Sequence, residues 1–322
     1  MGRMRRPIVV GITLLTVVLF AGEGFPFWIW SPKTKRLERP EKGVKPVPAD
    51  QLTWALSFFQ VKEYEQALRQ MENLVDRYPS SKEAAEAQYY VGRCDEALGD
   101  YYAAFKAYDK LSAHYPNSQR LGEAVEREYR IGNLFYSGKK RKLAGLEILP
   151  SLDKATEIFL RVVEQAPYGS YGVLAQYKVG ECHKKSGQYA QAKEAFEKLV
   201  EEYPNSELVD EARYQIALVT LKMSRKASYD DRTADEALVQ FNRFIKEHPQ
   251  SDLVSESLEA IQTLKDRKAE KAFETAQFYE KQGKTTAARF YYNQVIEQYG
   301  KSSWAQQALE RLTILERKSV SP

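Results

Sequence analysis

The chain has 322 residues, of which 43% are hydrophobic and 29% are charged, so it can build a substantial folded body. The net charge of +4 is concentrated at the start, because residues 1–45 hold nine Lys/Arg and three Asp/Glu. The remainder has 39 basic and 41 acidic residues. A nearly neutral body lacks the basic face that neutralises phosphates, so we expect no nucleic-acid partner.

The first thirty residues are typical of an export signal. Three arginines within the first six residues precede an apolar run, residues 7–22. That run is short for a membrane span, but only Glu23 separates it from further apolar residues up to Trp30. Two interpretations stay open: residues 1–24 are a cleaved signal peptide, or residues 7–30 remain as an N-terminal anchor that tethers an exported body.

The junction after the apolar run indicates export without lipidation. A lipoprotein signal would have a cysteine there, and Glu23 occupies that place. Residues 25–49 are predicted to be an extended tether, because they are rich in Pro and Lys and cannot bury a core.

A proline-centred turn recurs six times from residue 50 onward. Its anchor residues are Pro79, Pro116, Pro167, Pro204, Pro249 and Gly300. The spacings of 37, 51, 37, 45 and 51 residues are typical of stacked helix pairs. An alanine stands twelve residues before each anchor, and large apolar residues follow it at steps of four and three. These steps place them on one stripe of a helix.

The preceding helix of each pair is marked by small residues where the pair should pack most closely. They are Ala55, Gly92, Gly132, Gly180, Ala217 and Ala276. In three pairs a glycine, Gly99, Gly187 or Gly283, is predicted to form the turn between the helices. The predicted fold is therefore all-α, a tetratricopeptide-like solenoid of about six helix pairs over residues 50–317. Residues 303–317 are predicted to form a capping helix.

Two pairs carry insertions between their helices, residues 137–150 and 224–235. The first contains four consecutive basic residues, 139–142, followed by apolar ones. This pattern suits either contact with an anionic membrane surface or a solvated loop.

No residue pattern indicates catalysis. The three histidines, His114, His183 and His248, lack partners at metal-ligand spacing, and Cys94 and Cys182 occupy the same packed position of two separate repeats. We predict two core thiols without a bridge, because two repeats exceed the ~7 Å between Cα atoms that a disulfide spans. No phosphate loop or nucleophile elbow is present. We therefore expect a protein that is not an enzyme and that has no metal site and no cofactor.

The first helices carry aromatic and polar residues at one recurring position and one or two turns beyond it. We name these residues the first-helix face: Leu52, Phe59, Tyr89, Arg93, Tyr129, Asn133, Tyr136, Tyr177 and Tyr214. Tyrosine offers apolar area and a hydroxyl, which suits a groove that binds an extended client segment. The other interpretation, compatible with the first, is that the tyrosines pack between adjacent repeats.

Residues 210–302 resemble the BamD (YfiO/ComL) family of outer-membrane assembly factors. The resemblance rests on the insertion with residues 229–233 (YDDRT), on Phe241 and Pro249, and on a long linking helix with residues 264–267 (LKDR). It implies a scaffold in the periplasm, associated with the outer membrane, that binds periplasmic domains of the β-barrel insertase and unfolded outer-membrane protein segments. The residues it implies for the insertase contact are Asp266, Arg267, Tyr279 and Glu280.

This sequence differs from that family in three ways: the lipid-accepting cysteine is missing, six helix pairs replace five, and the last unit is only a capping helix. Two other functions stay open. One is a periplasmic cell-envelope coordinator like the Tol-Pal accessory protein, whose repeats also carry Tyr-Pro-x-Ser turns. The other is a general repeat adaptor for peptidoglycan enzymes or secretion.

Overall fold

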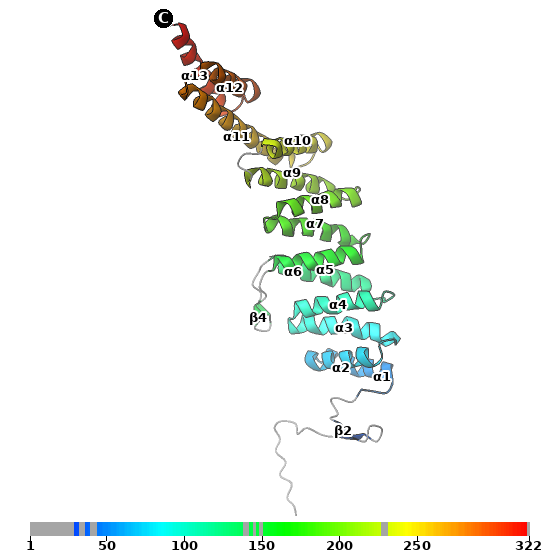
Figure 1. Ribbon diagram of the computed structural model, residues 1–322. Coiled ribbons are helices and arrows are strands. Elements are labelled where there is room, and N and C mark those ends of the chain that lie inside the picture. Colours follow the sequence, from blue (N-terminus) through cyan, green and yellow to red (C-terminus); the bar gives the residue numbers. More distant parts are fainter. Residues whose placement is uncertain are drawn as a thin grey trace, which may run out of the picture. The chain divides into compact units, whose positions relative to one another are not determined.

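The computed structural model describes residues 29–31, 36–38, 44–137, 142–143, 146–147, 151–226 and 231–320. These residues contain thirteen helices (Figure 1). They are α1 Pro48–Gln60, α2 Tyr64–Arg77, α3 Lys82–Leu98, α4 Tyr101–His114, α5 Leu121–Ser137, α6 Leu152–Gln165, α7 Ser170–Lys185, α8 Tyr189–Glu202, α9 Val209–Lys226, α10 Asp231–Glu247, α11 Val254–Lys281, α12 Thr285–Gln298 and α13 Ser303–Val320.

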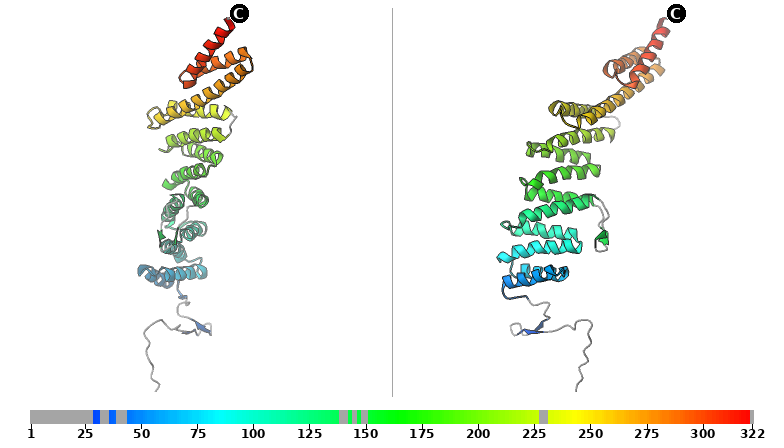
Figure 2. Two further views of the ribbon diagram at one scale, coloured as in Figure 1. Left: turned by 90° about the vertical axis from the view of Figure 1, so that its left-hand side faces the viewer. Right: turned by 180° about the vertical axis from the view of Figure 1, so that it is seen from behind.

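The chain divides into two compact parts, residues 1–47 and 48–322. In the second part, helices α1 to α12 form six helical hairpins, which we number as units one to six, and each unit packs against the next (Figure 2). The single helix α13 then packs against both α11 and α12. This arrangement confirms the predicted all-α repeat fold with six pairs and a capping helix.

The apolar stripe of the second helices forms the core. The six alanines and the large residue four positions after each are all 0% exposed. The small residues of the first helices are buried beside them. At Gly92 a Cβ atom would lie 2.5 Å from the ring of Tyr108, and the rings of Phe159 and Phe196 crowd the equivalent glycines in α5 and α7. The large ring occupies the space that a side chain on the first helix would need.

The turns have the roles that the sequence predicts. Gly99, Gly187 and Gly283 have φ angles of 87°, 73° and 73°, in the left-handed region that favours glycine. In all six proline-type turns the backbone N–H of the fourth residue donates to the carbonyl of the first, as from Ser81 to Tyr78 at 2.9 Å. The Ser81 hydroxyl then caps α3 by accepting from the N–H of Ala84 at 3.2 Å.

Helix α11 belongs to two separate cores. Its N-terminal half contributes Ile261 and Leu264 to the core of α9 and α10, whereas its C-terminal half contributes residues from Ala269 onward to the core of α12 and α13. Unit six is therefore attached to unit five through one continuous helix of 28 residues.

The structure corrects three details of the prediction. First, the helical body contains a short antiparallel pair, β3 Lys142–Leu143 and β4 Leu146–Glu147, inside the 137–150 insertion. Second, a hairpin of β1 Ile29–Ser31 and β2 Arg36–Glu38 lies in the predicted tether. Third, α9 and α10 extend into the predicted 224–235 insertion, which leaves only 227–230 between them. The basic residues 139–141 and most of the export signal lie outside the described residues.

Candidate interaction surface of the first helices

Tyr89 of the first-helix face lies between two repeats. Its side chain is 1% exposed, and its hydroxyl donates to Glu123 of α5. The guanidinium groups of Arg93 and Arg127 both donate to the hydroxyl oxygen of Tyr89, each at 3.1 Å. Burial raises the pKa of Tyr89, and the hydrogen bond to Glu123 raises it further. The burial corrects the prediction that Tyr89 offers its ring to a client; it joins α3 to α5 instead.

A tyrosine–glutamate bond between successive first helices recurs at a spacing of 34 residues. Tyr89 reaches Glu123, and the hydroxyl of Tyr177 donates to Glu211 of α9 at 3.1 Å. The bond from Tyr136 of α5 to Glu181 of α7, also 3.1 Å, joins the intervening pair of helices. Sequence reasoning missed these glutamates, although the shared spacing of 34 residues from Tyr89 to Glu123 and from Tyr177 to Glu211 was available as a signal; Glu181 lies 45 residues after Tyr136.

The other members of the first-helix face are partly exposed. Tyr129 packs against Phe159 and against Tyr171 of α7, with ring centroids 5.6 and 5.2 Å apart. The amide of Asn133 donates to the carbonyl of Tyr129 at 2.9 Å. The remaining members are Leu52, Phe59, Arg93, Tyr136, Tyr177 and Tyr214.

At the N-terminal end this face adjoins a groove. Leu52 lines an open groove of about 780 Å³ together with Tyr115, Pro116 and the residues of the first two proline turns. Two turns beyond Leu52 in α1, the ring of Phe59 lies with its centre 5.7 Å from the Arg93 guanidinium of α3, a cation–π contact. Apolar and cationic groups are therefore both accessible here.

A second recurring contact joins three helices through one glutamate. In unit two, Glu96 accepts from the hydroxyl of Tyr108 at 2.5 Å and from Arg127 of α5 at 3.2 Å. In unit six, Glu280 accepts from Tyr292 at 2.7 Å and pairs with Arg311 of α13. The spacings, 12 and 31 residues, are the same at both places.

This contact corrects the prediction for Glu280. Its side chain is 13% exposed and its carboxylate is committed to the capping helix, so it holds α13 rather than facing a partner. Burial raises the pKa of Tyr292 to about 12, and the hydrogen bond that Tyr292 donates to Glu280 contributes to the rise.

The other residues implied for the partner contact lie along the outer side of α11. Arg267 is exposed, and no ion pair to it is found among the described residues. Asp266 is half-buried and accepts from the amide of Gln262 at 3.0 Å. Tyr279 stacks on Tyr291 of α12, with centroids 5.5 Å apart and planes 8° from parallel.

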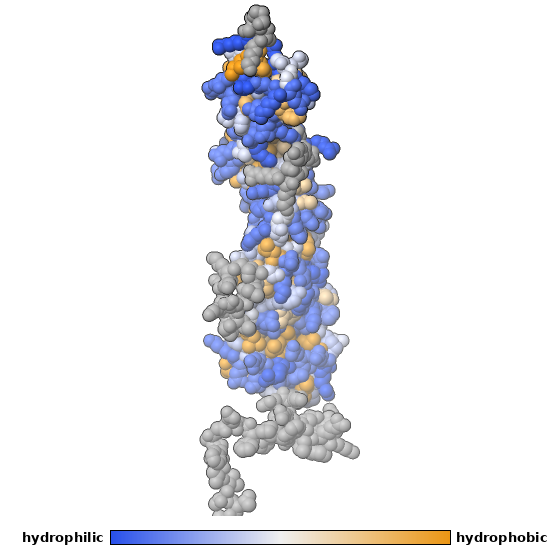
Figure 3. Space-filling view, turned by 60° about the vertical axis from the view of Figure 1, so that its left-hand side comes forward, coloured by the Kyte–Doolittle hydropathy of each residue, from blue (hydrophilic) through white to orange (hydrophobic). Residues whose placement is uncertain are grey.

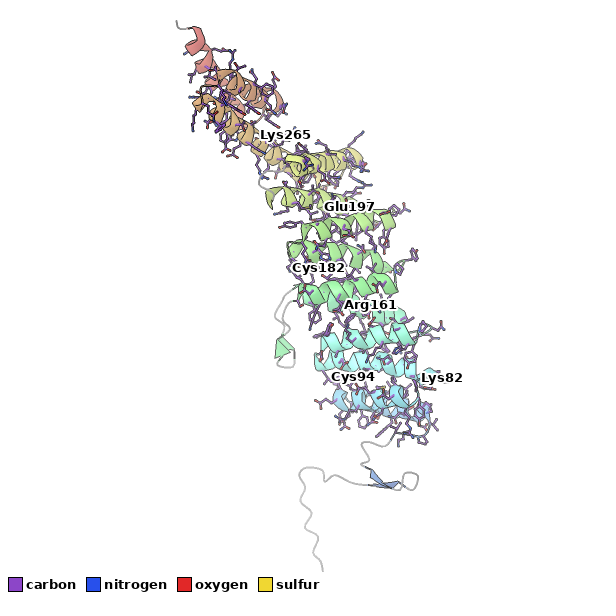
Figure 4. The ribbon with its side chains drawn as sticks, in the orientation of Figure 1. Lys82, Cys94, Arg161, Cys182, Glu197 and Lys265 are labelled. Carbon is purple, nitrogen blue, oxygen red and sulfur yellow. The ribbon has the colours of Figure 1, made fainter. Side chains whose placement is uncertain are left out.

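Both cysteines considered for chemistry lie in the core. Cys94 and Cys182 are buried free thiols in α3 and α7, well separated in Figure 4, and burial raises the pKa of Cys182 to about 11. No group of three His, Cys, Asp or Glu side chains is placed to hold a metal ion within the described part of the chain.

Among the helices of the described residues, none combines the length and apolar composition needed to cross a bilayer. The face drawn in Figure 3 is mostly hydrophilic, with hydrophobic residues in patches along the helices.

Comparison with known proteins adds family matches over most of the helical part. The sequence model of the YfiO family, described as outer membrane lipoprotein, matches residues 133–319, more than half of the chain. A tetratricopeptide-repeat model matches residues 52–118. No curated protein matches the chain.

Solved structures of repeat proteins are also similar. TTC0263, a thermophilic TPR protein of Thermus thermophilus, is 17% identical, with a TM-score of 0.32; the match covers 67% of this chain and 99% of that chain. MamA from Desulfovibrio magneticus RS-1 is 19% identical, with coverage of 65% and 99% and a TM-score of 0.31. YrrB, described as a TPR protein with an unusual peptide-binding site, is 18% identical, with coverage of 65% and 90% and a TM-score of 0.33.

Proposed function

Because the chain belongs to the YfiO family, whose description is outer membrane lipoprotein, we propose that it is a non-catalytic scaffold in the assembly of outer-membrane β-barrel proteins. In this role it binds periplasmic domains of the β-barrel insertase through its C-terminal units. It receives segments of unfolded outer-membrane proteins on the first-helix face. The family match over residues 133–319 carries the proposal, since it spans α11 and the whole of unit six.

The proposed insertase contact uses Asp266, Arg267 and Tyr279. Arg267 supports it most directly, because its guanidinium is exposed and can form a bidentate pair with a partner carboxylate. Asp266, one residue before Arg267, adds a carboxylate that can accept hydrogen bonds from the partner. A pair of opposite charges on a rigid helix favours one orientation of the partner.

The proposed client surface consists of the partly exposed members of the first-helix face. Barrel strands alternate apolar and polar residues, so such a segment can place rings beside Phe59 and Tyr129 and a carboxylate beside Arg93. Tyr89 is not part of this surface, because it is buried.

Exchanging the charges of Asp266 and Arg267 tests the proposed insertase contact. We expect Asp266→Arg with Arg267→Asp to weaken binding to purified insertase periplasmic domains at least tenfold, which corresponds to about 1.4 kcal/mol. The matched control is Lys198→Glu with Glu202→Lys in α8, which also preserves net charge and exchanges an exposed pair. Binding is measured by calorimetry and helicity by circular dichroism. Equal binding of both variants and the unaltered chain would place the contact elsewhere.

We further propose that the body acts in the periplasm, exported by residues 1–24 and associated with the outer membrane or cell envelope. Metabolic labelling with palmitate is expected to leave the protein unmarked. An N-terminal lipid needs a cysteine thiol, and Glu23 stands in its place; the only two thiols of the sequence are buried in helices. A known lipoprotein in the same cells is the positive control. A labelled band for this chain would show that the N-terminal signal has been misinterpreted.

A further inference from the structure

Four rings form a continuous row across the last hairpin. Phe278 and Tyr279 of α11 lie 5.6 Å apart, Tyr279 stacks on Tyr291 of α12 at 5.5 Å, and Tyr291 lies 5.3 Å from Phe290. We name these four residues the aromatic strip. Its two ends are open, since Phe278 is 56% and Phe290 is 66% exposed. The other aromatic residues of the hairpin include Phe273 and Tyr292, which are 3% and 0% exposed, so the hairpin buries rings elsewhere but not here.

The position of Phe278 within the repeat explains why this exposure is unusual. Phe278 follows the small packing residue Ala276 by two positions. The equivalent residues in units two, four and five are Cys94, Cys182 and Val219, and all three are 0% exposed. Leu134 of unit three is half-buried, and Ser57 of unit one, which has no preceding pair, is exposed. The position of Tyr291, one before the large core residue, is buried in units one to four, for example at Ala107 (4%) and Ile158 (0%), and half-buried at Gln240 in unit five. Both positions are buried in units two and four, where the stack covers this face.

The length of α11 leaves the same face open in unit six. The core that α10 shares with α11 ends at Leu264, and the core of unit six begins at Ala269. In unit two, by contrast, Ala107 packs into the core of unit one beside Met71 and Leu74 of α2. Unit six therefore presents to solvent a surface that unit two buries against a helix of the preceding pair.

The charges beside the strip are mostly positive, although the exposed Glu274 lies one turn before Phe278. Lys281 and Lys284 flank the turn between α11 and α12, and the ammonium of Lys284 lies 5.8 Å from the centre of the Tyr279 ring. The neighbouring acid, Glu280, is already paired with Arg311. Two copies of this surface facing one another would bring like charges together, which argues against self-association.

We propose that the aromatic strip docks an amphipathic helix of a partner protein, with apolar residues on one face and acidic residues beside them. We infer that the partner segment is helical because the equivalent face of unit two packs against a helix. The sign of the charge follows from the two lysines. Tyr279 also belongs to the proposed insertase contact, but the inference does not depend on which protein supplies the helix.

The probe is a synthetic amphipathic helix of about 20 residues, long enough to cover the hairpin, with a leucine face flanked by glutamates. Its counterpart has lysines in place of the glutamates. Fluorescence anisotropy of labelled peptides measures binding to the full chain. We expect the acidic peptide to bind at least tenfold more tightly than the basic one. Phe278→Ser with Phe290→Ser should reduce that binding at least tenfold, because both ring contacts are lost.

The matched control is Val239→Ser in α10 with Leu258→Ser near the start of α11, where both side chains are similarly exposed at 62% and 54%. It should bind the acidic peptide as the unaltered chain does. The proposal is overturned if the strip variant keeps the affinity, if the control loses it equally, or if the basic peptide binds as well. It is also overturned if the strip variant instead loses dimerisation in sedimentation or binding to anionic vesicles. If the exchange of Asp266 and Arg267 does not weaken insertase binding, the expected peptide results stay the same, so each proposal can be contradicted without the other.

Discussion

Gly92→Ala is expected to lower the free energy of unfolding by about 1–3 kcal/mol, the usual cost of overpacking a tight core. The added Cβ would lie 2.5–2.8 Å from three carbons of the Tyr108 ring. The ring cannot easily move away, because it is fully buried and its hydroxyl is held by Glu96 at 2.5 Å. The loss should appear in chemical denaturation followed by circular dichroism.

Gly122→Ala is the matched control for this prediction. Gly122 also lies in a helix, α5, but nothing is within 4 Å of a Cβ built there. Alanine is a better helix former than glycine by up to about 1 kcal/mol, so this variant should be as stable as the unaltered chain or more stable. Equal effects of the two substitutions would mean that the close helix contact is not what requires glycine.

Glu128→Gln is expected to stabilise the protein by on the order of 2 kcal/mol at pH 8. Units one, two and four place a buried glutamine at the equivalent position, and its amide donates to a carbonyl of the second helix, at 3.0, 2.9 and 2.8 Å. Unit three has Glu128, which is 0% exposed and accepts from Gln165 only at 3.4 Å. Its Oε2 atom has no hydrogen-bond partner among the described residues.

The free energy of unfolding of the unaltered chain is expected to fall as pH rises, because Glu128 is buried. Burial raises the pKa of Glu128 to about 8 from an ordinary value of 4.5. Between these values the folded state keeps a proton that the unfolded chain releases, so stability falls as pH rises through this window. Glutamine does not titrate, and its advantage should therefore grow from pH 5 to pH 8.

Denaturant titrations at pH 5 and pH 8 measure this difference. Asp95, whose pKa burial raises to about 7, is present in both proteins, so its contribution cancels in the comparison. Gln88→Glu is the reciprocal variant and should introduce the same loss of stability with rising pH. A gain from Glu128→Gln that is the same at both pH values would contradict the proposed burial of an ionisable carboxyl.

The fold was predictable because its determinants are local and repeat. Six alanines, six large residues and six turns at fixed offsets specify helix pairs, and those alanines and large residues are buried as predicted. The hairpin of β3 and β4 was not predictable in this way, because it occurs once and no second copy reveals its pattern.

The interaction surface was less predictable, because side-chain contacts between repeats decide it. Periodicity placed Tyr89 and Tyr177 on one face but could not tell a groove from a junction. The distinction depends on Glu123 and Glu211, each 34 residues farther along the chain. The resemblance likewise assigned Glu280 to a partner, whereas Arg311 of the chain's own last helix occupies it.

The glutamate contact at the last hairpin indicates what allows a pair of helices to be followed by a single helix. Arg311 meets Glu280 at the same separation, 31 residues, at which Arg127 of an interior pair meets Glu96. The capping helix thus occupies the place of an opening helix of a further hairpin. A pair with a glutamate at this position can therefore be followed either by a further pair or by a single capping helix, because each supplies the arginine. The pairs that have Phe59, Tyr136, Lys184 or Leu221 there cannot offer the same contact to a capping helix.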